Sequence, residues 1–326
     1  MKLVFFNLRE DEKSALESWR NAHPEVEIDV YTEELTSANK HLLEGKEGVV
    51  LAQNKPFERD VYEYAKEQGI KVFATRSAGF DIYDLELMSE LGIKMTNVPS
   101  YSPNAIAEHV LTSALRISRN TNKIQRNIEK HNFSWNPGIL SRELRTLTVG
   151  VIGTGRIGTQ AARLFNALGS KVLGYDVYQN EAAKEVLDYV ENLDDLIANS
   201  DIITIHMPAI KEYNHMVNDE FLAKMKDNSI LLNAARGMLV DTKAVLRALD
   251  SGKLLGAGLD VYENEGKYVP KNFEGKEFDD KLLQTLIDRD DVIYTPHTAI
   301  QNLVEGGLEA AVEVVATGTS ANVVNK

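Results

Sequence analysis

Three side chains of complementary chemistry each stand just past a predicted buried strand: Arg236, Glu265 and His297. A guanidinium can hold a carboxylate through two parallel hydrogen bonds, and an imidazole can deliver a proton near neutral pH. A carboxylate paired with that imidazole favours the protonated form and raises its pKa. Reduction of a 2-keto acid by hydride transfer needs these three functions: a cation for the carboxylate, a proton donor for the carbonyl oxygen, and a group that keeps the donor protonated.

A glycine-rich segment, 153–158, follows the apolar segment 147–152 and precedes a predicted helix at 160–168. In this position, successive backbone N–H groups and the helix N-terminus can face a pyrophosphate. Asp176 ends the next predicted strand, about 20 residues further on, where a carboxylate can bind ribose hydroxyls. Its charge would repel the 2′-phosphate of NADP. The pattern therefore predicts NAD as the cofactor, against the alternative of a plain turn before a helix.

Apolar segments alternate with amphipathic ones along two stretches of the chain, which is typical of α/β proteins with parallel sheets. The segments 10–21, 57–68 and 82–91 have helical spacing. The first series of predicted strands is 3–6, 26–31, 48–51, 72–75 and 93–97, and the second is 147–152, 171–176, 201–206, 229–233, 255–260 and 291–295. We therefore predict two doubly wound parallel-sheet domains, a Rossmann NAD-binding domain and a smaller flavodoxin-like substrate domain.

The length of 326 residues also favours two domains, because single cores stop growing at roughly 250–300 residues. A helical stripe over 103–131 is expected to connect them. The tail after His297 is too long for a simple cap, so we expect it to return to the first domain. The predicted boundaries are 1–100 plus 299–326 for the substrate domain and 101–298 for the NAD-binding domain.

Charge and composition exclude several classes of function. The net charge of −13 disfavours an extended nucleic-acid surface. The chain has no cysteine for disulfides or thiolate chemistry, and its seven histidines show no close ligand spacing, so no metal site is expected. The short apolar run at the start falls well below signal-peptide length, and no apolar run approaches the length of a membrane span. We expect a cytoplasmic protein.

Several segments together resemble the D-2-hydroxyacid dehydrogenase family, closest to its bacterial D-lactate and D-2-hydroxyisocaproate dehydrogenases. The resemblance covers nearly the whole chain, and the segments that carry it are 97–99, 101–109, 153–158, 239–242 and 295–299. Taken singly, Arg236, Glu265 and His297 would each be read as surface or structural residues. Their joint occurrence in the family's order reverses that interpretation.

The resemblance implies that Arg236 clamps the substrate carboxylate, that His297 is the general acid–base and that Glu265 raises its pKa. It also implies a homodimer. The implied cofactor-binding residues are Gly153, Gly155, Arg156, Ile157, Gly158, Asp176, Met207, Pro208, Ala234, Ala235, Arg236 and Asp260. The implied substrate-binding residues are Ser77, Ala78, Gly79 and Tyr101, with Ala52 and Ile300 along the side-chain pocket. For Tyr101, an interdomain packing role is an equal alternative. His109 and His206 are predicted to be structural.

The sequence departs from the lactate-type pattern where Ala52 and Ile300 replace aromatic residues. Smaller side chains should leave more room, so we expect activity on pyruvate, 2-ketoisocaproate or phenylpyruvate without a fixed preference. Whether Tyr213, which replaces a small polar residue, contacts the cofactor stays open. The alternative function is a non-catalytic NAD-sensing binding protein. Among enzymes, Glu265 argues against a formate dehydrogenase, and the missing regulatory domain weakens a phosphoglycerate dehydrogenase.

Overall fold

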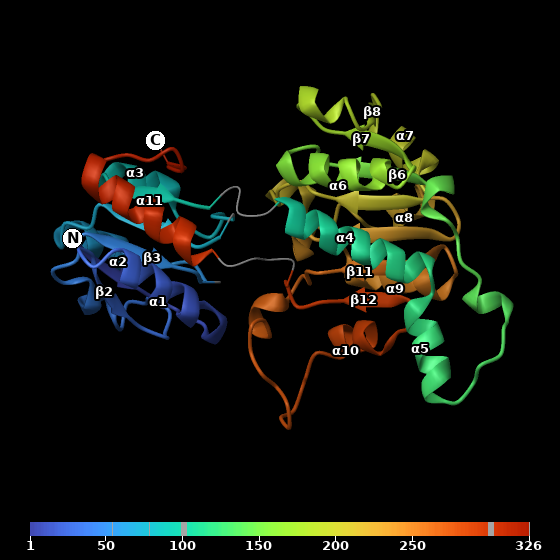
Figure 1. Ribbon diagram of the computed structural model, residues 1–326, viewed down its shortest axis with the longest axis horizontal. Helices are drawn as coiled ribbons and strands as arrows, with labels where there is room; N and C mark the ends of the chain where they lie inside the picture. The colour runs from blue at the N-terminus through green and yellow to red at the C-terminus, as the bar shows by residue number, and fades with distance from the viewer. Residues whose placement is uncertain (54, 78, 99–102, 299–302, 326) are drawn as a thin grey trace. The chain divides into compact units, whose positions relative to one another are not determined.

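A computed structural model describes residues 1–53, 55–77, 79–98, 103–298 and 303–325 (Figure 1). The chain divides into two compact units, one formed by Met1–Tyr101 with Gln301–Lys326 and the other by Ser102–Ile300. Each unit has its own parallel sheet and its own apolar cores, and each is described by itself. Among the described residues, no helix has both the length and the apolar character needed to cross a membrane.

The first unit contains a five-stranded sheet in the order β2-β1-β3-β4-β5, in which every neighbouring pair is parallel. This is the order of flavodoxin-like sheets, so the predicted fold class is confirmed for this unit. The three inner strands are short, largely apolar runs, as expected where helices cover both faces, whereas the two edge strands carry more polar residues. The strands are β1 (Lys2–Phe5), β2 (Glu27–Val30), β3 (Gly48–Leu51), β4 (Val72–Thr75) and β5 (Lys94–Thr96).

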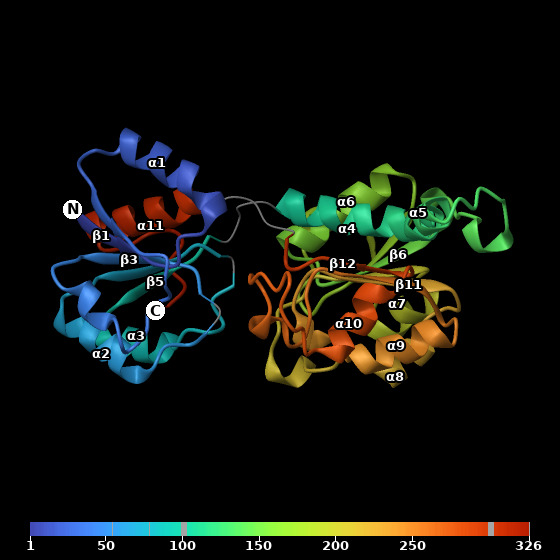
Figure 2. The same ribbon diagram turned by 90° about the horizontal axis from the view of Figure 1, so that it is seen from below.

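Helices cover both faces of this sheet (Figure 2). On one face, α1 (Lys13–Ala22) and α11 (Val304–Thr317) pack against side chains such as Leu3 and Phe5. On the other, α2 (Arg59–Glu67) and α3 (Leu85–Leu91) pack against alternate residues of the same strands. The C-terminal segment of the chain therefore returns to the first unit, where α11 covers one face of the sheet.

The second unit contains a seven-stranded parallel sheet in the order β12-β11-β10-β9-β6-β7-β8. Counted within the unit, this is the Rossmann order 3-2-1-4-5-6 with a seventh strand beyond the sixth, which confirms the predicted fold class. The strands are β6 (Thr148–Ile152), β7 (Lys171–Tyr175), β8 (Asp188–Tyr189), β9 (Ile202–Ile205), β10 (Ser229–Asn233), β11 (Leu254–Leu259) and β12 (Val292–Tyr294).

Helices also cover both faces of the larger sheet. One face carries α4 (Pro103–Ser118) and α6 (Arg156–Ala167), from which α5 (Thr121–Glu129) extends (Figure 2). The other face carries α7 (Leu193–Asn199), α8 (Asp219–Lys224), α9 (Thr242–Asp250) and α10 (Lys281–Asp288). Short 3-10 helices are η1 (Glu10–Glu12), η2 (Lys40–Leu43), η3 (Pro137–Ile139), η4 (Leu144–Thr146), η5 (Glu181–Ala183), η6 (Lys211–Tyr213), η7 (Gly237–Leu239) and η8 (Glu265–Lys267).

Two details correct the sequence-based prediction. The stripe over 103–131 is not one helix, because Asn120 adopts a left-handed backbone with φ of 53° and separates α4 from α5. Asparagine tolerates this conformation better than other residues with a side chain, apart from aspartate. The sheet contains one strand, β8, besides the six that the sequence predicts. Its two residues lie at the sheet edge and form no apolar run that could be detected.

Candidate active site

Three neighbouring strands of the larger sheet end side by side. The register pairs Asn233 with Leu259, and Leu259 with Tyr294, so the last residues of β10, β11 and β12 lie in a row. Because the strands are parallel, the segments after them meet at the same edge, where ligands of open α/β sheets bind. Arg236, Glu265 and His297 belong to these three segments.

A hydrogen bond joins His297 to Glu265. The Nδ1 atom of His297 lies 2.8 Å from Oε1 of Glu265. The second oxygen of Glu265, Oε2, accepts a hydrogen bond of 2.9 Å from the backbone amide of Tyr262, which fixes the carboxylate. His297 has a left-handed backbone with φ of 57°, and its amide donates to the carbonyl of Asp260 at 2.7 Å. The pair therefore leaves Nε2 of His297 as the ring nitrogen available for proton transfer.

The buried carboxylate of Asp260 organises the turn that carries His297. Its Oδ1 accepts hydrogen bonds from the Thr295 hydroxyl at 2.6 Å and from the Thr298 amide at 2.9 Å. Nε2 of His109, on α4, lies 3.0 Å from the same hydroxyl and 3.5 Å from Oδ1 of Asp260. His109, predicted from sequence to be structural, thus belongs to the polar network of Asp260 and Thr295 that supports the His297 turn. A contact of Asp260 with the cofactor stays a prediction.

The surroundings of His297 act on its proton affinity in opposite directions. Burial lowers the pKa, because an imidazolium ion loses hydration. The hydrogen bond to Glu265 and the negative charges of Glu265 and Asp260 raise it, while the positive charge of Arg236 lowers it. The raising effects are the larger together, so the pKa of His297 lies above its usual value. The histidine is thereby suited to hold a proton near neutral pH.

Arg236 lies in a turn that is held by a side chain whose role the sequence pattern did not predict. The buried Asn233 donates from Nδ2 to the carbonyl of Arg236 at 2.9 Å and accepts from the amide of Ala235 at 3.0 Å. The next residue, Gly237, has no room for a side chain, because a Cβ would lie 2.2 Å from the carbonyl carbon of Tyr262. The Arg236 turn therefore packs directly against the segment that leads to Glu265. The sequence signal for this role is that a polar residue, Asn233, ends the otherwise largely apolar strand β10.

The glycine segment after β6 meets the steric demands of a phosphate-binding turn. Gly153 has φ of 89°, and a Cβ there would lie 2.7 Å from the carbonyl carbon of His206. A Cβ at Gly158 would lie 1.9 Å from the carbonyl oxygen of Gly153, so only glycine lets α6 start this close to the turn. At Gly155, by contrast, a Cβ would meet nothing within 4 Å. This open space before the N-terminus of α6 suits a pyrophosphate.

Asp176 follows β7 beside the glycine turn. One oxygen, Oδ2, accepts a hydrogen bond from the Thr154 amide at 2.6 Å, and Oδ1 accepts one from the Tyr178 amide at 3.0 Å. An ionised carboxylate offers about four acceptor positions, so ribose hydroxyls can still be bound. The residues present therefore fit the adenosine end of NAD.

The other predicted cofactor residues lie along the same edge of the sheet. Arg156 and Ile157 form the first turn of α6, with Arg156 exposed. The amide of Met207 lies against the glycine turn, 2.8 Å from the place a Gly153 Cβ would take, and Pro208 follows it at the surface. Ala234 and Ala235 follow β10, between Asn233 and Arg236. Tyr213 is partly buried in η6 and packs against the core; no contact of its side chain with a cofactor follows from this.

The predicted substrate residues that the structure describes belong to the first unit. Ala52 follows β3, while Ser77 and Gly79 follow β4 at the same edge of the five-stranded sheet. The Ser77 hydroxyl donates to the carbonyl of Gly79 at 2.6 Å, which closes a tight loop. Ala78, Tyr101 and Ile300 lie outside the described residues.

Comparison with known proteins identifies the family. A family model for the NAD-binding domain of D-isomer specific 2-hydroxyacid dehydrogenases matches residues 111–299. The D-lactate dehydrogenase of Treponema pallidum is 46% identical over 321 residues, which cover 97% of each chain. A D-2-hydroxyacid dehydrogenase (NAD(+)) of Clostridioides difficile is 39% identical over the full length of both chains. The solved structure of a D-2-hydroxyisocaproate dehydrogenase superimposes over the full length of both chains with a TM-score of 0.92 at 34% identity.

The family model covers more than half of the chain, and these relatives match it over 97% and 100% of its length. The fold, the glycine turn and the relatives agree with one another. The chain belongs to the family of D-isomer specific 2-hydroxyacid dehydrogenases, which are NAD-dependent oxidoreductases.

Proposed function

We propose that this dehydrogenase reversibly reduces a small 2-keto acid to the D-2-hydroxy acid at the edge where β10, β11 and β12 end. The observation that carries the proposal is the 2.8 Å pair of His297 and Glu265, next to the segment that holds Arg236. This arrangement combines a proton donor, a group that keeps it protonated, and a cation. The relatives of the chain are named as dehydrogenases, which favours an enzyme over a non-catalytic NAD-sensing protein.

In this proposal each residue of the trio has a separate role. Arg236 binds the substrate carboxylate through two hydrogen bonds and polarises the neighbouring carbonyl, a geometry that lysine cannot reproduce. His297 gives the proton on Nε2 to the carbonyl oxygen as the carbonyl carbon is reduced, and in the reverse direction takes it back. Glu265 holds the opposite ring nitrogen and favours the imidazolium. Bound NADH supplies the hydride.

The proposed cofactor contacts use the second unit alone. The N-terminus of α6 and the backbone at Gly155 would hold the pyrophosphate, and Asp176 the adenosine ribose. Because the carboxylate of Asp176 would repel a 2′-phosphate, we expect kcat/KM with NADH to exceed that with NADPH by at least about tenfold. Equal use of the two cofactors would contradict this assignment.

The substrate side chain is proposed to lie near Ala52, a partly buried residue after β3. Each additional buried methylene contributes about 0.8 kcal/mol, so a larger 2-keto acid would gain from the space that a small residue leaves. Relatives of the chain are named for substrates of different size, lactate in one case and 2-hydroxyisocaproate in another. We propose substantial activity on 2-ketoisocaproate or phenylpyruvate as well as on pyruvate.

A panel of 2-keto acids of increasing size, assayed by the loss of NADH absorbance, tests this function. No keto-acid-dependent loss with any of them would overturn it. Ala52→Tyr is expected to depress turnover of phenylpyruvate while it spares pyruvate. A pyruvate preference in the unaltered enzyme that Ala52→Tyr leaves unchanged would show that this position does not set substrate size.

The proposal includes a homodimer in the cytoplasm, where NAD and 2-keto acids occur. The segment after α5 exposes large apolar side chains: Phe133, Trp135 and Leu140 are 71%, 95% and 73% exposed. Clustered exposed apolar groups are typical of surfaces that a partner covers. Light scattering coupled to size-exclusion chromatography should give twice the chain mass of 36.4 kDa, and Trp135→Ser should shift it toward the monomer.

A further inference from the structure

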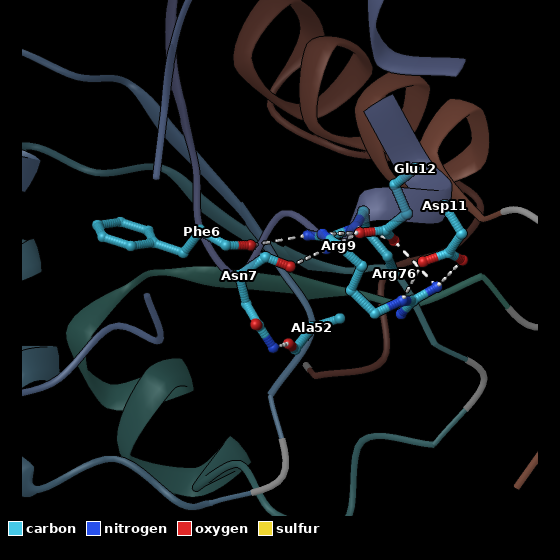
Figure 3. A network of polar contacts seen from close by, with 7 residues as sticks. All are labelled: Phe6, Asn7, Arg9, Asp11, Glu12, Ala52 and Arg76. Carbon is cyan, nitrogen blue, oxygen red and sulfur yellow. Dashed lines mark hydrogen bonds and ion pairs between the residues drawn. The ribbon is translucent and has the colours of Figure 1, made fainter. Parts of the chain in front are cut away.

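A buried ion pair lies where β4 ends, in the first unit (Figure 3). Arg76 is 1% exposed, and so is its partner Glu12. The two form a bidentate pair, with Nε of Arg76 3.1 Å from Oε1 of Glu12 and Nη2 2.9 Å from Oε2. The guanidinium also lies over the ring of Phe5, 3.9 Å from its centre. Glu12 is held in turn by the amide of Arg9, which donates to Oε2 at 3.0 Å.

Stability alone does not account for such a pair. Taking two charges out of water costs several kcal/mol for each ion, and apolar replacements of both partners are often neutral or stabilising. What an apolar pair cannot reproduce is directed hydrogen bonding, since a guanidinium carries five donors in a rigid fork. The groups that accept hydrogen bonds from the Arg76 guanidinium therefore indicate the role of the pair.

The remaining donors of Arg76 hold the backbone just past β1. Nη1 donates to the carbonyl of Phe6 at 3.1 Å, and Nη2 to the carbonyl of Asn7 at 2.9 Å. The backbone amide of Arg76 donates to the carbonyl of Leu51 at 2.7 Å, at the end of β3. One residue thus ties the ends of β1, β3 and β4 together.

Asn7 extends this connection to the residue proposed to line the substrate pocket. Its backbone is left-handed, with φ of 55°, and its side chain reaches the segment that follows β3. There the amide nitrogen, Nδ2, donates to the carbonyl of Ala52 (Figure 3). Ser77, whose hydroxyl closes the loop to Gly79, is bonded directly to Arg76 in the chain. The hydrogen bonds around the ion pair therefore reach Ala52 through Asn7, and Ser77 follows Arg76 directly in the chain.

We propose that Arg76, Glu12 and Asn7 are positioning residues of the substrate site: they hold the chain where β1, β3 and β4 end, so that Ala52, Ser77 and Gly79 meet the keto acid in one fixed arrangement. This inference rests on the proposed function. None of the three residues needs to touch the substrate. Their loss should weaken binding of the keto acid and leave binding of NADH, assigned to the second unit, unchanged.

The central experiment separates positioning from stability. Arg76→Met combined with Glu12→Leu removes both charges together, so that neither is left buried without its partner. We expect this double variant to fold with a somewhat lower melting temperature, because the carbonyls of Phe6 and Asn7 lose a donor, while KM for the keto acid rises about tenfold or more. NADH affinity, measured by fluorescence without substrate, should change less than twofold. The control is Ile28→Ala, which removes a buried side chain of β2 and should lower the melting temperature without raising KM.

A milder variant keeps the test decisive if the double variant does not fold. Asn7→Gly retains the left-handed backbone and removes only the hydrogen bond to Ala52. It should raise KM for the keto acid severalfold at unchanged NADH affinity. The matched control is Asn120→Gly, at a left-handed asparagine of the second unit that holds the carbonyl of Leu140, and it should leave KM unchanged.

Two outcomes have separate meanings. A keto-acid KM within twofold of the unaltered enzyme in a folded double variant and in Asn7→Gly would overturn the positioning role while the proposed function stands. An unaltered enzyme that binds NADH but reduces no 2-keto acid would overturn the proposed function itself, and the inference with it.

Discussion

Two histidines of the larger sheet occupy comparable places in the fold and differ in chemistry. His206 follows β9 and His297 comes three residues after β12, both at the carboxyl edge. The ring of His206 meets a hydroxyl, with Nε2 2.9 Å from Oγ1 of Thr204, and burial lowers its pKa to about 4. The ring of His297 meets a carboxylate. Burial lowers the pKa of His297 as it lowers that of His206, but the pKa of His297 is nevertheless raised.

The difference shows that the partner, not the place at the sheet edge, decides whether the pKa of a buried histidine is raised or lowered. A hydroxyl can satisfy a neutral imidazole but does not offset the loss of hydration of a charged one. His206 is therefore neutral in the range where enzymes work, and its backbone, packed against Gly153, is its contribution to the site. Of these two histidines, His297 is the one suited to donate a proton.

The largest expected effect is that of His297→Gln. Glutamine keeps a polar side chain but cannot exchange a proton, and general acid–base catalysis typically contributes about 10²–10⁴-fold. We expect kcat for keto-acid reduction to fall by this amount, with NADH affinity within about twofold of the original. Steady-state rates and NADH fluorescence check the two parts. A fall of less than tenfold would show that another group supplies the proton.

Glu265→Gln sharpens the comparison because it gives His297 a neutral partner, as His206 has. Reduction needs protonated His297, so kcat/KM is constant below the histidine pKa and falls above it. Glutamine can still accept the hydrogen bond from Nδ1, but the Glu265 charge is gone. Of the two negative charges that raise the pKa only that of Asp260 remains, and burial and Arg236 both lower it. The falling limb should therefore move to lower pH.

The oxidation direction provides the control for this variant. Oxidation needs neutral His297, so its rate rises through the same pKa, and this limb should also move to lower pH. On the alkaline side, reduction should lose about tenfold for each pH unit of displacement. Profiles that keep the original midpoints would show that Glu265 orients His297 without tuning it.

Much of this comparison could be predicted from the sequence, because it depends on strand ends. Short apolar runs bounded by polar residues define the strands, and a parallel sheet brings the segments after its strands to one edge. The positions of Arg236, Glu265 and His297 beyond three predicted strands are therefore enough to predict that they share this edge. The roles of the three residues stay predictions until they are tested.

The rest depends on contacts between residues distant in sequence. Arg76 and Glu12 are separated by 64 positions, and nothing in either segment marks them as a buried pair. The link from His109 to Thr295 spans 186 positions. The break at Asn120 and the two-residue strand β8 lack the signals that glycine, proline or an apolar run provide. Local pattern thus predicts elements and their ends, and tertiary contacts select the residues that support them.

The smallest expected effect on activity is that of His206→Gln. The amide can replace the ring in the hydrogen bond to the Thr204 hydroxyl, and a histidine with a pKa of about 4 is already neutral during turnover. We therefore expect kcat and KM within about twofold of the original and unchanged midpoints in both pH profiles. A shifted profile would show that His206 shares the titration assigned to His297, and the comparison would fail.

His206→Gln should nevertheless change how the free energy of unfolding depends on pH. In the unfolded chain His206 titrates near its ordinary pKa of about 6.5, and in the folded protein only near 4. Between these values the unfolded state binds the extra proton, so acidification through this window favours unfolding. Glutamine does not titrate, so urea unfolding from pH 7 down to about 4.5 should show a smaller loss of stability in His206→Gln than in the unaltered enzyme. Because the carboxylates are common to both proteins, the difference between the two curves isolates His206, and parallel curves would mean that its folded pKa is not lowered.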